Sequence, residues 1–258
     1  MKSRIIAAVI GLAASAASQA QIVTPTTTGG SDLLLDVWEQ AAASSAPDQS
    51  FTLNLGRTMT QFLASDGSSS TLATVLATDT TWTNFLASSS IPDLQWSVIA
   101  SGNKVPTRAS LLGTVTIGED PIDFDLLNVN VLVGNAQLST TIANLNVQAT
   151  PNEQVNSLVS GAYYQTYQLS NFNENAWDNG NALGATGVHV AQSLNVAGTS
   201  QTLAPTTVLK GTMSFAPDSA GNFVLNYTVD PLPEAPGFFA MLAGLGALRL
   251  IGRRRKSL

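Results

Sequence analysis

Few residues in this sequence have the types and spacing that catalysis or metal binding requires. The chain has one histidine, His189, and no cysteine, so most metal sites and activated nucleophiles lack their usual residues. Ser101 and Lys104 have the Ser-x-x-Lys spacing in which a lysine activates a serine, but the companion Ser-Asp-Asn and Lys-Thr-Gly elements do not occur. We interpret this tetrapeptide as a turn, and we predict no catalytic residue, no cofactor and no enzyme.

An acidic group lies between Glu119 and Asp125. In an extended chain Asp123 and Asp125 point to the same side, where two carboxylates are weak candidates for calcium ligands; in a helix they diverge. A solvated loop is the alternative. Carboxylates that cleave a glycosidic bond need only meet in space, so the sequence leaves a carboxylate-dependent hydrolase open.

Four tryptophans offer rings on which a sugar can stack. Trp38, Trp82 and Trp96 occur at spacings typical of a protein core. Trp177 lies in a loop rich in asparagine and glycine, residues 171–187, and is the predicted glycan contact.

The N-terminus has the pattern of a secretory signal peptide. Lys2 and Arg4 precede an apolar run, residues 5–17, and small residues follow at 18–20. We predict a signal helix in residues 1–20 with cleavage after Ala20, and a flexible lead-in over residues 21–30. A retained N-terminal anchor is the alternative.

The C-terminus combines a proline-rich spacer, an apolar run and a block of positive charge. The apolar run, residues 237–252, spans roughly 24 Å as a helix, somewhat less than a bilayer core. We predict a transmembrane helix there; a buried soluble helix is the alternative. The positive-inside rule places the cluster of Arg253, Arg254, Arg255 and Lys256 in the cytoplasm and the preceding body outside.

These C-terminal residues carry a family resemblance. Pro233, Glu234 and Pro236, followed by a short glycine-containing apolar run and terminal arginines, resemble the PEP-CTERM sorting signal of bacterial surface proteins, with Ala235 between Glu234 and Pro236. Residues 229–233 are similar to the VPLPA-type variant. The resemblance implies that residues 231–258 are recognised, and the tail removed, by an exosortase, a membrane-embedded processing enzyme. The expected partners are the secretory translocon, signal peptidase and that enzyme.

Charge separates the two ends from the body. Seven of the 11 basic residues lie in the targeting ends, so residues 21–236 keep four basic and all 17 acidic residues, a net charge of −13. Nucleic acid and anionic lipid surfaces repel such a body. Its polar residues are mostly uncharged, which suits contact with extracellular polysaccharide.

The body, residues 31–230, has a mixed pattern. Period-two alternation and short apolar runs predict strands at 32–38, 51–55, 94–99, 110–117, 188–190, 207–209, 212–215 and 223–229. Period 3.6 predicts a short helix near Met59, another around Trp82 that Asp79 can cap, a helix over 134–147 and one from Pro151 to Tyr163; residues 121–133 fit either pattern. We predict an α+β fold, an antiparallel sheet or sandwich with a central helical segment; the alternative is a mainly β sandwich.

Taken together, the sequence predicts an exported surface or extracellular-matrix protein without catalytic activity, anchored transiently in the inner membrane and associated with exopolysaccharide or biofilm. The alternatives are a carbohydrate-binding module on the cell surface and a carboxylate-dependent hydrolase.

Overall fold

The computed structural model describes residues 21–39, 49–105, 108–115, 126–150, 152–157, 162 and 180–229 of the 258 residues. Within these ranges the chain is mostly antiparallel β-sheet with few helices. The elements in chain order are β1 (Asp32–Glu39), β2 (Gln49–Thr58), α1 (Met59–Ala64), β3 (Ser70–Val75), α2 (Thr80–Ser88), the 3-10 helix η1 (Ile91–Asp93), β4 (Leu94–Val105), β5 (Arg108–Val115), β6 (Leu126–Leu127), α3 (Asn128–Asn146), β7 (Glu153–Ser157), β8 (Asn181–Ala182), β9 (Val188–Leu194), β10 (Leu203–Ala204), β11 (Thr206–Pro217) and β12 (Phe223–Val229).

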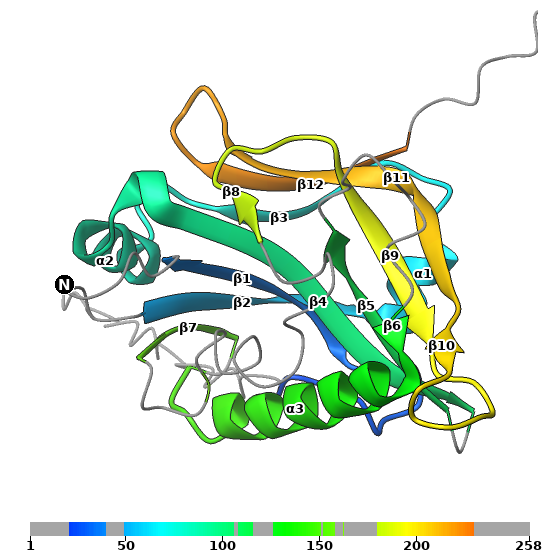
Figure 1. Cartoon of the computed structure of the whole chain (residues 1–258). Coiled ribbons are helices and arrows are strands. Elements are labelled where there is room, and N and C mark those ends of the chain that lie inside the picture. Colours follow the sequence, from blue (N-terminus) through cyan, green and yellow to red (C-terminus); the bar gives the residue numbers. More distant parts are fainter. Residues whose placement is uncertain are drawn as a thin grey trace, which may run out of the picture.

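One sheet forms most of the body. Its strand order is β3-β12-β11-β9-β5-β4-β1-β2-β7, and β8 pairs with β4 at the side. Figure 1 shows the sheet curling into a half-barrel, with β3, β12 and most of β11 in an upper wall and β4, β1 and β2 in a lower wall. The mainly β alternative therefore describes the body best, with one curled sheet supplying both layers, and the predicted central helix is present as α3.

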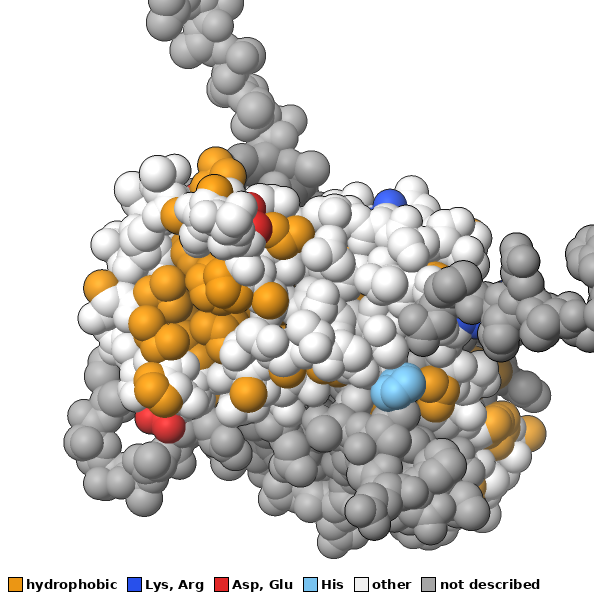
Figure 2. Space-filling model, turned by 90° about the horizontal axis from the view of Figure 1, so that it is seen from above, with side chains coloured by type: hydrophobic (Ala, Val, Ile, Leu, Met, Phe, Trp, Pro, Cys, Tyr) orange, Lys and Arg blue, Asp and Glu red, His pale blue; other side chains and the backbone are white. Residues whose placement is uncertain are grey.

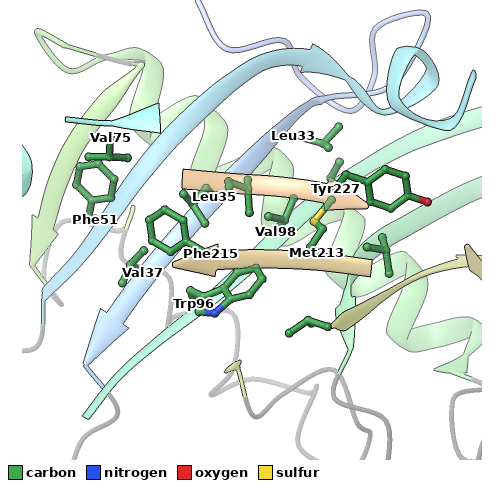
Figure 3. Packing of buried hydrophobic residues seen from close by; sticks show 14 of the residues in the cluster. Leu33, Leu35, Val37, Phe51, Val75, Trp96, Val98, Met213, Phe215 and Tyr227 are labelled. Carbon is green, nitrogen blue, oxygen red and sulfur yellow. The ribbon is translucent and has the colours of Figure 1, made fainter. Parts of the chain in front are cut away.

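The space between the walls is filled by apolar side chains, which we call the inner core. Alternate residues of each strand point into it, as Leu33, Leu35 and Val37 do from β1. Figure 3 shows Phe215 and Met213 of the upper wall lying against the side chains of the lower wall. The largest fully buried side chains of this core are Trp82, Trp96, Tyr227, Phe51, Phe62, Phe85 and Phe215.

Trp82 of α2 joins the two walls. Its ring is 4.9 Å from that of Phe51 in β2, 5.2 Å from Phe223 in β12 and 6.0 Å from Phe215 in β11, all edge-to-face. Asp79 begins the helix by accepting hydrogen bonds from the backbone of Thr81 and Trp82, at 2.8 and 3.0 Å. The predicted capping by Asp79 and the predicted burial of Trp82 are both confirmed.

A second apolar layer, the outer core, lies between α3 and the opposite face of the sheet. Figure 1 shows α3 running below the lower wall. The helix buries Val131, Leu138, Ile142 and Leu145. Their spacing of three, four and seven residues is that of one helix face.

Of the ambiguous residues 121–133, residues 126–127 form β6 and 128–133 are helical, because loop 199–202 satisfies the start of α3; residues 121–125 lie outside the described residues. The backbone N–H groups of Asn128 and Val129 donate to the carbonyls of Thr202 and Ser200, at 2.8 and 3.1 Å. The Asn128 side chain also bonds the backbone of Val196 and Thr199. These partners are about 70 residues away, so local periodicity could not distinguish helix from strand.

The predicted helix from Pro151 to Tyr163 is wrong where the structure describes it. Val155 lies in β7, which pairs with β2; it packs against the inner core, while Gln154 and Asn156 are buried on the opposite face, toward α3. Polar residues at the buried outer-core positions hid the strand's alternation, and β2 supplied the hydrogen-bonding partner. Residues 158–161 and 163 lie outside the described residues.

The other strand predictions are largely confirmed. Residues 207–209 and 212–215, predicted as separate strands, form the single strand β11. Ser101 and Lys104 lie within β4, so the interpretation of this tetrapeptide as a turn is wrong. Strand β3 was not predicted, because the apolar residues of its sequence STLATV, Leu72, Ala73 and Val75, do not alternate with the polar ones.

None of the helices in the described part of the chain is long and apolar enough to cross a membrane. The predicted signal helix and the predicted C-terminal helix lie outside that part.

Candidate functional site

The outward side of β9, β11, β12 and β3 carries a surface of uncharged polar side chains, which we call the hydroxyl–amide face. It exists because Met213, Phe215, Leu225 and Tyr227 take the inward positions, leaving their neighbours to point to solvent. Its members are Thr71, His189, Thr212, Ser214, Asn226 and Thr228, each half-buried or exposed.

Strand register sets these side chains beside one another. Thr212 is opposite Thr228 on one side and His189 on the other. Asn226 is opposite both Ser214 and Thr71, and the Thr71 hydroxyl donates to the Asn226 amide oxygen at 2.8 Å. Because directly opposed side chains lie about 5 Å apart, the face is a regular lattice of hydrogen-bond donors and acceptors.

Toward the β11–β12 hairpin the same side of the sheet becomes apolar, where Ala216 lies opposite Val224. Figure 2 shows uncharged polar side chains over much of this view, hydrophobic side chains gathered at its left and few charged side chains. Sugars present polar edges and apolar ring faces, so a polar lattice beside an apolar area matches both.

Two carboxyl groups meet at the opposite edge of the sheet. Glu153 in β7 is hydrogen-bonded to Asp79, the residue that caps α2. Burial, and next the Asp79 charge, raise the pKa of Glu153 to about 7. The hydrogen bond brings the Glu153 and Asp79 carboxyls closer together than the two carboxyls of a glycosidase, which are roughly 5 Å or more apart. The pair is therefore better suited to sharing one proton than to cleaving a glycosidic bond.

A third carboxyl lies inside the sheet. Asp36 of β1 is 3% exposed and accepts a hydrogen bond of 2.5 Å from the Thr52 hydroxyl. Burial raises the pKa of Asp36 to about 7, although the Thr52 bond partly opposes the rise. Sequence reasoning missed Asp36 and Glu153; the only available signal for Asp36 was an acid within an apolar strand.

Replacing Glu153 with glutamine should change how stability depends on pH. In the folded protein the raised pKa lets Glu153 hold its proton up to about pH 7, and in the unfolded chain only up to the ordinary pKa of a glutamate, 4.5. Stability therefore falls as pH rises through this window. Water screens the half-exposed pair and keeps the effect small. We expect Glu153→Gln to raise the free energy of unfolding by about 1 kcal/mol relative to wild type at pH 8, and to leave it unchanged at pH 4.

Urea unfolding at the two pH values measures this difference. Asp79→Asn is the matched control, since it keeps a capping oxygen and removes the charge next to Glu153. An equal effect of Glu153→Gln on the free energy of unfolding at both pH values would contradict a proton shared between Glu153 and Asp79.

Most residues singled out from the sequence lie outside the described residues. These are the cleavage residue Ala20, the calcium candidates Asp123 and Asp125, the glycan candidate Trp177, the sorting residues Pro233, Glu234 and Pro236, and the basic cluster Arg253 to Lys256. His189 is described, half-buried in β9. The described residues contain no group of three or more potential metal ligands.

Comparisons with known proteins give no relative: no family model, no curated protein and no solved structure matches this chain.

Proposed function

We propose that this protein is an exported, non-catalytic surface or matrix protein that is sorted by an exosortase-like enzyme and contacts extracellular polysaccharide. The observation that carries the proposal is the hydroxyl–amide face. An uncharged lattice of hydroxyl and amide groups on an acidic body suits a neutral, hydroxyl-rich polymer.

The boundaries of the body support the sorting part of the proposal. Ile22 is 1% exposed, and its backbone N–H and carbonyl both bond the Asn146 side chain, at 2.8 and 2.9 Å. At the other end β12 finishes at Val229. Predicted cleavage after Ala20 therefore leaves Ile22 with its partners, and removal of residues after 233–236 leaves β12 whole.

The polysaccharide contact is tested by co-sedimentation of the purified protein with exopolysaccharide from its native host. The double variant Thr212→Glu, Ser214→Glu places two negative charges in the middle of the hydroxyl–amide face. We expect it to lose at least about tenfold in affinity for the exopolysaccharide. Thr140→Glu, at an exposed position of α3, is the matched control and should bind as the wild type does.

The carbohydrate-binding module remains a second candidate, favoured by the apolar area next to the polar lattice. Trp177→Ala distinguishes the two possible contact surfaces. Loss of binding in Trp177→Ala alone would move the contact to residues 171–181. No binding by wild type would contradict the polysaccharide role altogether.

A further inference from the structure

Four buried polar side chains lie on the outer-core face of three neighbouring strands. They are Asp36 of β1, Thr52 of β2, and Gln154 and Asn156 of β7, and none is more than 3% exposed. The registers place Asp36 opposite Thr52, and Thr52 opposite Gln154. A carboxyl, a hydroxyl and a primary amide therefore form one row within the sheet.

Their contacts orient the hydroxyl and the amide. Thr52 Oγ1 donates its proton to Asp36 Oδ1 at 2.5 Å, so its lone pairs are directed elsewhere. Thr52 and Gln154 are directly opposed in an antiparallel pair, where Cβ atoms lie about 5 Å apart, so rotation of the Gln154 side chain can carry its carbonyl carbon to Thr52 Oγ1. Gln154 Nε2 donates to the Leu145 carbonyl at 3.2 Å, which holds the amide nitrogen toward α3.

We propose that Thr52 and Gln154 react with each other to form an intramolecular ester that cross-links β2 to β7. Thr52 Oγ1 attacks Cδ of Gln154 as its proton passes to the Asp36 carboxylate. The tetrahedral intermediate collapses when Asp36 returns that proton to the amide nitrogen, the C–N bond breaks and ammonia leaves. A hydroxyl and a primary amide become an ester and ammonia, with no oxidant, reductant or cofactor.

The surroundings supply what this reaction needs. Asp36 acts as base and then as acid, and a carboxyl whose pKa burial raises to about 7 is populated in both forms at neutral pH. Asn156 lies two residues beyond Gln154 on the same face of β7. Gln148 Nε2 donates a hydrogen bond to Asn156 Oδ1 at 2.8 Å. The buried amide nitrogen of Asn156, Nδ2, has no hydrogen-bond partner in the part of the chain that the structure describes. That N–H group is the available donor for the developing oxyanion on Gln154.

The cross-link would tie down the last strand of the sheet. β7 ends the strand order and pairs only with β2 among the described strands. Thr52 and Gln154 are about a hundred residues apart in sequence, so an ester between them constrains the unfolded chain as a long-loop disulfide does. The chain has no cysteine with which to make one. The inference is independent of sorting and of polysaccharide binding.

Intact mass of the purified full chain tests the ester. Wild type is expected to weigh one ammonia, about 17 Da, less than its sequence, and Thr52→Val should not show this loss. Peptide mapping should give a linked pair of peptides holding Thr52 and Gln154, which alkaline hydroxylamine separates. The comparison with Thr52→Val also subtracts any ammonia lost by cyclisation of an N-terminal glutamine.

Three further variants separate the roles. Thr52→Ser keeps the nucleophile and should keep the ammonia loss. Asp36→Asn keeps a polar side chain but removes the base, and should slow the reaction at least about a hundredfold after refolding. Ser97→Ala removes the buried hydroxyl opposite Asp36 in β4 and should react as wild type does.

The proposal is overturned if folded wild type and Thr52→Val show the same number of ammonia losses after prolonged incubation at pH 8. It is also overturned if the linked peptides contain other residues. Should Thr52→Val fail to fold, peptide mapping of the wild type before and after hydroxylamine treatment decides alone.

Discussion

Replacing Trp82 with alanine is expected to lower the free energy of unfolding by about 3–5 kcal/mol, the range for removing a large aromatic side chain from a core. Trp82 is 1% exposed, and its ring contacts Phe51 on one wall and Phe215 and Phe223 on the other. Its loss leaves a cavity where the two walls meet. Because cores are close-packed and relax only partly, the walls cannot close over it without cost.

Urea denaturation followed by far-UV circular dichroism measures the change. Trp82→Phe keeps an aromatic ring at the centre and should lose less than half as much. A loss below about 1 kcal/mol for Trp82→Ala would contradict the packing described here, since surface substitutions usually cost no more than that.

Replacing Asp36 with asparagine is expected to remove most of the pH dependence of stability between pH 4 and pH 8. Burial raises the pKa of Asp36 from the ordinary aspartate value of 3.8 to about 7, so the folded state holds a proton that the unfolded state releases. Stability is then full below about pH 4 and falls as pH rises toward 7. A shift of about three pKa units corresponds to at most about 4 kcal/mol.

Unfolding free energies at pH 4, 6 and 8 give the slope for wild type and variant. The slope is the readout, because Asp36→Asn also removes the proposed base for the ester and so changes absolute stability. Ester formation would remove the Thr52 hydrogen bond that lowers the pKa, so the sign of the slope is the same with or without the cross-link. A wild type whose stability rises from pH 4 to pH 8 would contradict the buried carboxyl.

Sequence pattern predicted the elements whose stabilising contacts are local. The alternation from Phe51 to Leu55 and the Asp79 cap before Trp82 both identify structure from a few adjacent residues, and both are confirmed. The element that was predicted wrongly and the one that was left open both depend on distant partners. β7 is a strand because β2 pairs with it, and the first turn of α3 is helical because loop 199–202 satisfies its backbone.

The candidate site shows the same division. His189 was recognised as a strand residue, but the lattice around it joins residues from β3 and β12 that lie more than 100 residues apart in sequence. Asp36, Thr52 and Gln154 likewise meet only through strand register. No local motif marks either group. The pairing of the strands brings their residues together, and the sequence does not show that pairing.

The most direct test of the proposed function is the intact mass of the mature protein from its native host, with and without the exosortase-like enzyme. The proposal predicts a wild-type chain that begins at Gln21 and ends near Pro233 to Pro236, and a chain that keeps residues 237–258 when the enzyme is deleted. A wild-type protein that still carries Arg253 to Lys256 would show a plain membrane anchor and contradict sorting.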